Sequence, residues 1–454
     1  AAPLPTLVLV SGVLLVGLCA YFRSRIGRAA LISLGVSLLG YALLGRGFAY
    51  LGFPPFFVGE LVLALLLLAT LVTPRVRLPI RSPVIIALLT FMLIGIASTF
   101  PHLGTYGIAT ARDAVVWGYG LFALAVCSLL LRLKAIPRVI RAYSRALPWL
   151  ITCAPVALLI ARLGASHIPT LPTSGVPILN PKGGDIAVHL AGALAFLVLG
   201  VVETRRARRL AQEWLWWLAW LAGCLIVFTG RAAVLTVTAV ALLILAVRPV
   251  SRWGKVAFIV LAAGLAFASL DLKINLGTSR SVSVDDLLLT VRSVFGETGE
   301  EVYDGTRNWR LMWWNDIIGY TIHGDYFWTG KGYGINLADA DGYQVHSDGS
   351  VRNPHNGHLT ILARSGVPGA VSWVVLQLLF AGSLLVAYFR ARRSALRDWA
   401  VLNLWILCYW LAFTLNGAFD VFLEGPQGGI WFWSLFGFGI AVLESQRQEM
   451  RRLT

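Results

Sequence analysis

Long apolar runs separated by short polar connections make up most of this chain of 454 residues. Runs of about 20 apolar residues have the length that a helix needs to cross a bilayer. The candidate runs lie at 4–22, 29–45, 56–73, 84–100, 113–131, 146–162, 185–203, 213–229, 232–247, 255–270, 358–389, 399–417 and 428–444. The pattern predicts an all-α polytopic membrane protein with 12 or 13 transmembrane helices, and a first run that is a mature span rather than a signal peptide.

A single long polar stretch, at about 271–354, interrupts the alternation. It divides the chain into an N-terminal helix bundle at 1–270, a large loop region at 271–354 and C-terminal transmembrane helices at 355–454. Within this loop, residues 306–322 have helical periodicity and are rich in tryptophan, as expected of a helix in the headgroup zone. We therefore expect a loop that carries short helices.

Composition and charge exclude a soluble domain and a nucleic-acid-binding surface. The chain is 57% hydrophobic and only 13% charged, with a mean hydropathy of +0.74. Of its 38 Lys and Arg residues we count 25 in alternate connections, which the positive-inside rule assigns to the cytoplasm. The net charge of +16 is therefore a topology signal, and the large loop is predicted to lie outside the cytoplasm.

The segment Asn353-Pro354-His355-Asn356 ends the polar stretch and carries the first candidate catalytic residue. Asn353 is a natural N-cap and Pro354 a natural first helical residue, so we expect His355 in the first turn. There the helix dipole favours an anion, and a neutral histidine beside an anion can act as a base. His358 shares its face and could form a metal site with it, but no third ligand is evident; we predict no metal, with His358 a supporting neighbour.

Three arginines on the outer side are candidates for binding a diphosphate. Arg231 lies in a hinge between two apolar runs, where a snorkelling arginine is the simpler interpretation. Arg307, Arg310 and Trp314 share one face of the predicted helix at 306–322, which could also be an interfacial anchor. In the functional interpretation Arg310 reaches toward His355 and, with Arg231, binds the diphosphate through charge-assisted hydrogen bonds; which of Arg307 and Arg310 makes the contact stays open.

Other polar residues of the C-terminal half give weaker signals. The spaced glycines Gly330, Gly332 and Gly334 predict a turn and do not form a phosphate-binding P-loop. Asp339-Ala340-Asp341 has the spacing of a metal-binding DxD motif, but its soft, glycine-rich surroundings favour a solvated surface. Asp420 and Glu424, in a short outer connection, are candidates for orienting His355.

One motif in this half resembles the signature of bacterial O-antigen ligases. His355-Asn356 is followed, after nine residues, by Gly366-Val367-Pro368-Gly369. A Thr-Gly-Arg step at Arg231, an arginine followed by a tryptophan in the large loop, and a glycine-rich turn ahead of the histidine are similar as well. The resemblance covers about 225–440 and extends to a superfamily that includes O-antigen polymerases and protein O-oligosaccharyltransferases.

The resemblance implies a GT-C-like glycosyltransferase of the bacterial inner (plasma) membrane, multi-pass, with its active site on the periplasmic face. Such an enzyme transfers O-antigen polysaccharide from undecaprenyl diphosphate to lipid A-core; it is inverting and metal-independent and uses no cofactor. His355 would be the general base, Arg231, Arg310 and Arg307 would bind the diphosphate, and Asn356, His358, Asp420 and Trp314 would support the site. Its partners would be the lipid-linked donor, the lipid A-core acceptor and membrane lipids.

Two alternatives stay open at the level of sequence. A polymerase would keep the donor site and use another carrier-linked repeat as acceptor. A transporter is the general default for so many spans, and Glu60 and His189 do lie within apolar runs, but we find no paired broken segments. The family is usually described with twelve spans and a cytoplasmic N-terminus, whereas the charge alternation here favours thirteen and an external N-terminus.

Overall fold

The computed structural model of this chain is almost entirely helical. It describes residues 23–54, 56–73, 78–201, 214–228, 230–248, 301–347 and 349–453, with residues 254, 274–275, 281–282, 292 and 299. Within these residues the strands form two short antiparallel pairs: β1 (Gly52–Phe53) with β2 (Phe56–Phe57), and β3 (Ile274–Asn275) with β4 (Ser281–Val282). The prediction of an all-α polytopic membrane protein is confirmed.

The helices follow the apolar runs closely. The N-terminal ones are α2 (Arg23–Leu44), α3 (Arg46–Ala49), α4 (Val58–Val72), α5 (Pro83–Thr99), η1 (Phe100–His102), α6 (Leu103–Tyr106), α7 (Ile108–Asp113), α8 (Val115–Gly118) and α9 (Gly120–Leu133). Next come α10 (Ile136–Pro148), η2 (Trp149–Cys153), α11 (Ala154–Leu163), η3 (Ala165–His167), α12 (Gly183–Leu199), α14 (Trp214–Val227) and α15 (Arg231–Val247). The last are α18 (Glu301–Ile322), α19 (Leu337–Asp341), α20 (Gly357–Arg393), α21 (Arg397–Gly417) and α22 (Pro426–Leu453).

Within the described residues, seven helices are long and apolar enough to cross a membrane, and four shorter apolar helices accompany them. The predicted runs 4–22 and 255–270 lie outside the described residues. The total of 12 or 13 spans and the side of the N-terminus therefore stay predictions.

One span is longer than its apolar run. The run at 146–162 is the second half of a helix that begins at Ile136 and continues through α10, η2 and α11 to Leu163. Its first half is amphipathic: Ile136, Ile140 and Leu147 are buried, whereas Arg138 and Arg141 are exposed. A search for uninterrupted apolar residues does not detect a helix with such a charged face.

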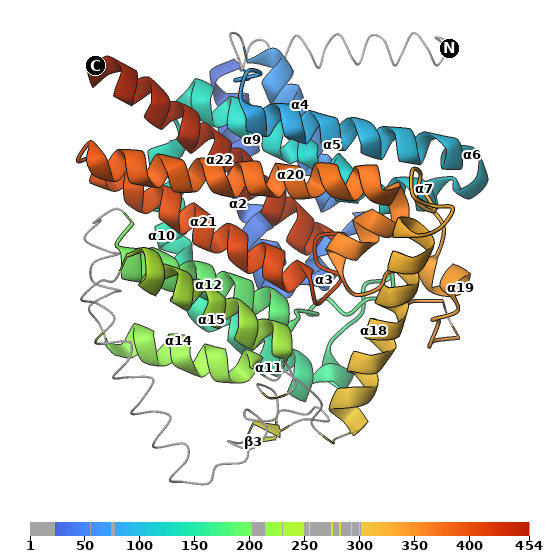
Figure 1. Cartoon of the computed structure of the whole chain (residues 1–454). Helices are drawn as coiled ribbons and strands as arrows, with labels where there is room; N and C mark the ends of the chain where they lie inside the picture. Colours follow the sequence, from blue (N-terminus) through green and yellow to red (C-terminus); the bar gives the residue numbers. More distant parts are fainter. Residues whose placement is uncertain are drawn as a thin grey trace, which may run out of the picture.

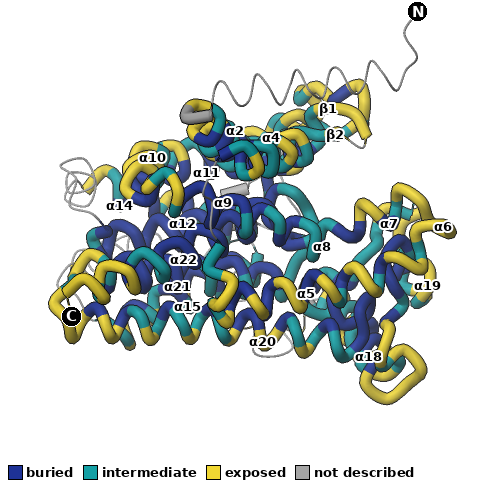
Figure 2. The backbone as a smooth tube through the Cα atoms, turned by 90° about the horizontal axis from the view of Figure 1, so that it is seen from above, coloured by how far each residue is buried: buried dark blue, intermediate teal, exposed yellow. Residues whose placement is uncertain are grey.

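The centre of the bundle is formed by α12, in which every residue from Asp185 to Leu199 is buried. It packs on α15 and α21, α21 packs on α20 and α22, and α22 packs along α9. Figure 2 shows this buried centre between helices whose outer faces are exposed. On α20 the exposed face carries Val371, Val374 and Leu378, as expected of a surface that contacts lipid.

The two ends of the bundle differ in character. In Figure 1, α18, α19, α6 and α7 gather at the end where α20 begins. At the opposite end the last turn of α20 contains Arg390, Arg392 and Arg393, and the last turn of α9 contains Arg132. The loop helices thus lie at the end away from these arginines, as the charge pattern predicts.

The long helix α20 is interrupted by Gly366, whose φ is 62° and ψ −167°. The segment 327–332 pairs with the break through backbone hydrogen bonds, among them Val367 N to Phe327 O (2.7 Å) and Lys331 N to Ala363 O (2.7 Å). A side chain at Gly366 would place its Cβ 2.4 Å from the Phe327 oxygen. The glycine of the signature is therefore required by a close backbone approach.

Candidate functional site

The start of α20 differs from the sequence prediction. Asn356, and not Asn353, is its N-cap, because the Asn356 side chain accepts hydrogen bonds from His358 N (3.0 Å) and Leu359 N (3.1 Å). The side chain of Asn353 instead accepts a hydrogen bond from Arg364 Nη2 at 3.0 Å. His355 therefore precedes the helix, in a left-handed backbone conformation with φ 53°. The prediction that it lies in the first helical turn is wrong.

His355 lies beside the carboxylate of Asp420. Its Nδ1 is 3.6 Å from Asp420 Oδ1, and its side chain is 28% exposed. The Trp309 ring meets the imidazole edge-on, with 6.0 Å between the ring centroids. Asp420 belongs to the connection between α21 and α22, so the two residues come from separate parts of the chain. In this arrangement Nδ1 faces Asp420, and the other ring nitrogen, Nε2, does not.

Lys182 completes this cluster from a third part of the chain, immediately before α12. Its Nζ lies 2.8 Å from Asp420 Oδ1 and 3.0 Å from Oδ2. Burial opposes ionisation of Asp420, but the neighbouring His355 and Lys182 outweigh it and hold the pKa of this carboxyl well below its usual range. Asp420 is thus a negative charge that can orient the imidazole and stabilise it when protonated.

The predicted face of α18 contacts both sides of this cluster. Arg310 Nη1 donates to the carbonyl oxygen of Phe419, the residue before Asp420, at 2.7 Å. Trp314 Nε1 donates to the carbonyl oxygen of Pro354, the residue before His355, at 2.8 Å. Arg307 lies one turn earlier on α18. The helix predicted at 306–322 is confirmed, and it brings Arg310 to the connection that carries Asp420.

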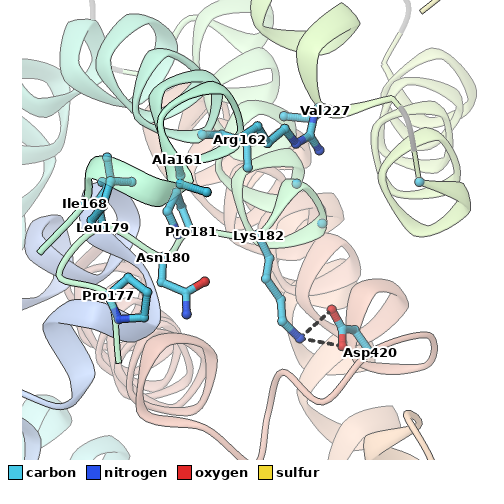
Figure 3. Close-up of a pocket in the computed structure, with 15 residues that line it drawn as sticks. Ala161, Arg162, Ile168, Pro177, Leu179, Asn180, Pro181, Lys182, Val227 and Asp420 are labelled. Carbon is cyan, nitrogen blue, oxygen red and sulfur yellow. Dashed lines mark hydrogen bonds and ion pairs between the residues drawn. The ribbon is translucent and has the colours of Figure 1, made fainter. Parts of the chain in front are cut away.

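A cavity of about 490 Å³ opens next to the cluster. Its lining comes from α11, the connection before α12, the first turn of α12, the end of α14 with Gly230 after it, and the Asp420 connection. The lining residues are Leu158, Ala161, Arg162, Ala165, Ile168, Pro177, Leu179, Asn180, Pro181, Lys182, Gly183, Gly184, Val227, Gly230 and Asp420. Figure 3 shows Lys182 extending toward Asp420, with Arg162 above it. Arg231 is the first residue of α15, directly after the lining residue Gly230.

Sequence reasoning did not assign Lys182 or Arg162 to the site. Arg162 Nη1 donates to the carbonyl oxygen of Ile226 at 2.9 Å, which fixes the guanidinium at the cavity wall. One signal was available for Lys182: it directly precedes the helix α12, as Arg231 begins α15, so both place a cation at the start of an apolar run. Asp420, the residue that Lys182 binds, is 238 positions away in the sequence.

His358 and Glu424 have different surroundings from His355 and Asp420. His358 Nε2 lies 3.0 Å from the carbonyl oxygen of Thr414, and its Nδ1 accepts a hydrogen bond from Trp373 Nε1 at 2.9 Å. Both nitrogens of this ring are thereby occupied. Glu424 accepts a 2.8 Å hydrogen bond from Thr360 Oγ1, and burial, aided by the charge of Asp420, raises its pKa to about 7. Of the two carboxylates, Asp420 is the one beside His355.

A buried ion pair supports the segment that leads to His355. The side chain of Arg364 is 1% exposed, and its Nη2 lies 3.0 Å from Asp113 Oδ2. Its Nη1 donates to the carbonyl oxygens of Gly332 and Ile335, each at 3.2 Å.

Gly330, Gly332 and Gly334 have positive φ angles of 62°, 79° and 107°, which confirms the turn. Arg352 Nη2 also reaches Asp113 Oδ2, at 3.0 Å. Neither Asp113 nor Arg364 was assigned a role from sequence.

The carboxylates of the DxD-like motif bind other side chains of the protein. Asp341 pairs with Lys331 and accepts a hydrogen bond from Trp313 Nε1 at 2.6 Å. Asp339 Oδ1 accepts from Gln344 Nε2 at 2.9 Å. In the part of the chain that the structure describes, no three His, Cys, Asp or Glu residues form a group that could hold a metal ion.

Comparison with known proteins agrees with this architecture. The fold and the site define a class of protein: a multi-pass helical membrane protein with a His–Asp–Lys cluster at one end of its bundle. Residues 216–374 match the family model described as O-Antigen ligase. This match supports the predicted O-antigen ligase superfamily and a membrane glycosyltransferase of the ligase and polymerase group. No curated protein gives a significant match.

Proposed function

We propose that this protein transfers O-antigen polysaccharide from undecaprenyl diphosphate to lipid A-core on the periplasmic face of the bacterial inner membrane. The observation that carries the proposal is the contact between His355 and Asp420 beside Lys182 and Arg310, at the end of the bundle away from its arginine-rich turns. His355 itself lies within the residues that match the O-antigen ligase family model. A base beside several cations suits a reaction whose leaving group is an anion.

In the proposed reaction His355 is the general base. With Nδ1 toward Asp420, Nε2 takes the proton of the acceptor sugar hydroxyl as its oxygen attacks the anomeric carbon of the donor. The new glycosidic bond forms as the bond to the diphosphate breaks, and the diphosphate leaves with the bonding electron pair. Attack from the face opposite the leaving group inverts the anomeric centre. General-base assistance contributes a factor of about 10² to 10⁴, and Asp420 stabilises the imidazolium that forms.

The arginines act on the leaving group. Arg231, Arg310 and Arg307 would bind the diphosphate and stabilise the negative charge that develops as it departs. Arg310 is fixed by its hydrogen bond to the Phe419 carbonyl, and Arg231 begins a helix at the cavity edge. Because the glycosyl diphosphate is already activated, the reaction needs neither ATP nor a metal ion. Asn356 supports the site as the cap that orients the segment next to His355.

The test is transfer by purified protein in the absence of divalent metal. Wild-type protein should join undecaprenyl-diphosphate-linked glycan to lipid A-core, and His355→Ala should lose transfer while still binding the donor. His323→Ala, which removes an exposed histidine from the end of α18, is the matched control and should remain active. Full activity of the His355→Ala protein would remove His355 from the mechanism.

The choice of acceptor separates a ligase from a polymerase. A ligase modifies lipid A-core and ignores a second carrier-linked repeat, whereas a polymerase does the reverse. In cells, loss of a ligase leaves long free chains and uncapped core, and loss of a polymerase leaves core that carries single repeats. Substrate flux in proteoliposomes without any glycosyl transfer would reverse the proposal in favour of a transporter.

A further inference from the structure

The carboxylate of Asp420 is placed between two possible partners. Lys182 holds both of its oxygens, at 2.8 and 3.0 Å. His355 Nδ1 is buried, lies 3.6 Å from Oδ1, and has no hydrogen-bond partner among the described residues. In this state the imidazole is not yet oriented by a hydrogen bond. A small movement of the carboxylate toward His355 would make that bond. The backbone N–H of Val421 also donates to Oδ1, at 2.7 Å, so Lys182 is the side chain, and not the only group, that holds the carboxylate in place.

Lys182 also lines the 490 Å³ cavity, so a ligand there can compete for it. Its side chain is 31% exposed and extends toward Asp420, which also lines the cavity (Figure 3). The second cation of the lining is Arg162, and the first turn of the 17-residue helix α12 begins at Gly183 and Gly184, which are themselves lining residues. Lysine, backbone N–H groups at a helix start and an arginine are together the donors that phosphate prefers.

The remaining lining is apolar. Leu158, Ile168, Leu179 and Val227 face the same space as the two cations. A cavity with a cationic side and an apolar side fits an amphipathic molecule whose phosphate joins a sugar to a lipid chain. A free inorganic anion would leave the apolar side unused.

We propose that the cavity binds the phosphate of a lipid-linked substrate, and that Lys182 moves from Asp420 to this phosphate, which frees Asp420 to bind His355 Nδ1. The assignment of His355 as a base rests on the proposed function; the exchange of Lys182 between carboxylate and phosphate does not. The consequence is that binding of the anion prepares the imidazole. The phosphate can belong to the isoprenyl diphosphate of the donor or to a phosphorylated glycolipid acceptor.

Lipid binding to the purified full-length protein tests the exchange directly. The probes are an isoprenyl diphosphate, the matching isoprenol without phosphate, and a phosphorylated glycolipid. Lys182→Met should weaken binding of the phosphate-bearing ligand about 10- to 100-fold and leave isoprenol unaffected. Asp420→Asn should tighten it about two- to fivefold, because it releases Lys182 from a partly exposed ion pair.

The double variant makes these opposite effects decisive. In the Lys182→Met background, Asp420→Asn should no longer tighten binding, because there is no lysine to release. Arg141→Met is the matched control, since Arg141 is an exposed cation on the basic face of α10, and it should bind as the wild type does. Thermal unfolding of each variant identifies any variant that is misfolded. The double variant lacks both members of the ion pair, so it leaves neither charge without its partner.

The response of His355 tests the second half of the proposal. With ¹⁵N-labelled histidine, and the His355 signal assigned by its absence from His355→Ala protein, the phosphate-bearing probe should shift the Nδ1 resonance of the wild type. The same addition should leave it unchanged in Asp420→Asn protein.

Equal weakening by Lys182→Met and Asp420→Asn, or equal loss of isoprenol binding, would overturn the proposal. Comparison of the two phosphate-bearing ligands identifies the source of the phosphate. Since none of these measurements requires glycosyl transfer, a protein that binds as expected and transfers nothing would refute the proposed function alone.

Discussion

Trp314 fixes the peptide that precedes His355: its indole N–H donates to the carbonyl oxygen of Pro354 over 2.8 Å. Trp314→Phe keeps the aromatic ring and removes only this donor. One hydrogen bond of this kind contributes about 1 kcal/mol, so we expect transfer to fall about fivefold in kcat, with donor binding unchanged. Steady-state kinetics with varied donor concentration measures both quantities.

Trp328→Phe is the control for this substitution, because the Trp328 side chain is 75% exposed. It should leave kcat unaltered. A kcat for Trp314→Phe equal to that of the wild type would show that the Pro354 contact does not position His355.

Gly366 and Gly382, both within α20, predict opposite outcomes for the same substitution. Gly366→Ala forces a φ of 62° on an alanine and brings its Cβ to 2.4 Å from the Phe327 oxygen, so a loss of stability of about 2 kcal/mol or more is expected. Gly382→Ala meets nothing within 4 Å and should leave stability equal or raise it. Thermal unfolding in detergent compares the two variants. Equal stability of both would mean that the break in α20 relaxes freely.

Glu424 makes stability depend on pH. Burial raises its pKa from 4.5 to about 7, so the folded protein binds more protons than the unfolded chain between these values. This group's contribution to stability therefore declines as the pH rises from 4.5 through 7. Glu424→Gln removes the charge, so its melting temperature should exceed that of the wild type at pH 8 and match it at pH 4.5. A difference that is constant between these pH values would contradict the assignment.

Arg364 is expected to tolerate no replacement by lysine. Its guanidinium binds Asp113, Asn353 and the carbonyl oxygens of Gly332 and Ile335, and a lysine ammonium cannot reach all four. Arg364→Lys should destabilise the protein by about 2 to 4 kcal/mol through buried acceptors that lose their donor. Arg352→Lys, at a more exposed arginine that shares Asp113, should cost less. Denaturation of the two variants side by side checks the order.

The sequence predicts most spans because each is a nearly uninterrupted apolar run, and it predicts α18 because Trp309, Trp313 and Trp314 mark its faces. It does not predict the first half of the helix that starts at Ile136, where basic residues alternate with buried ones. Nor does it predict the break at Gly366, which depends on a backbone approach by residues 327–332.

The candidate site is predicted in part for a similar reason. His355 and Asp420 could be named from the chain because each stands next to an apolar run. Arg310 and Trp314 could be named because they share one face of a predicted helix. The N-cap at Asn356 could not be predicted from the sequence, because either asparagine could cap the helix. In the structure Arg364 binds the side chain of Asn353, and Asn356 is the cap. Lys182 acquires its role only when folding brings it to Asp420.

The backbone conformation of His355 lowers stability at the position where we propose that the side chain is needed for activity. A φ of 53° suits glycine, and histidine adopts it at a cost of about 1 kcal/mol. A chain selected for thermal stability alone would therefore drift toward glycine here and lose the base that we propose. Because the proposed mechanism needs the imidazole, a screen for more stable variants of this protein should be paired with an activity assay at every round.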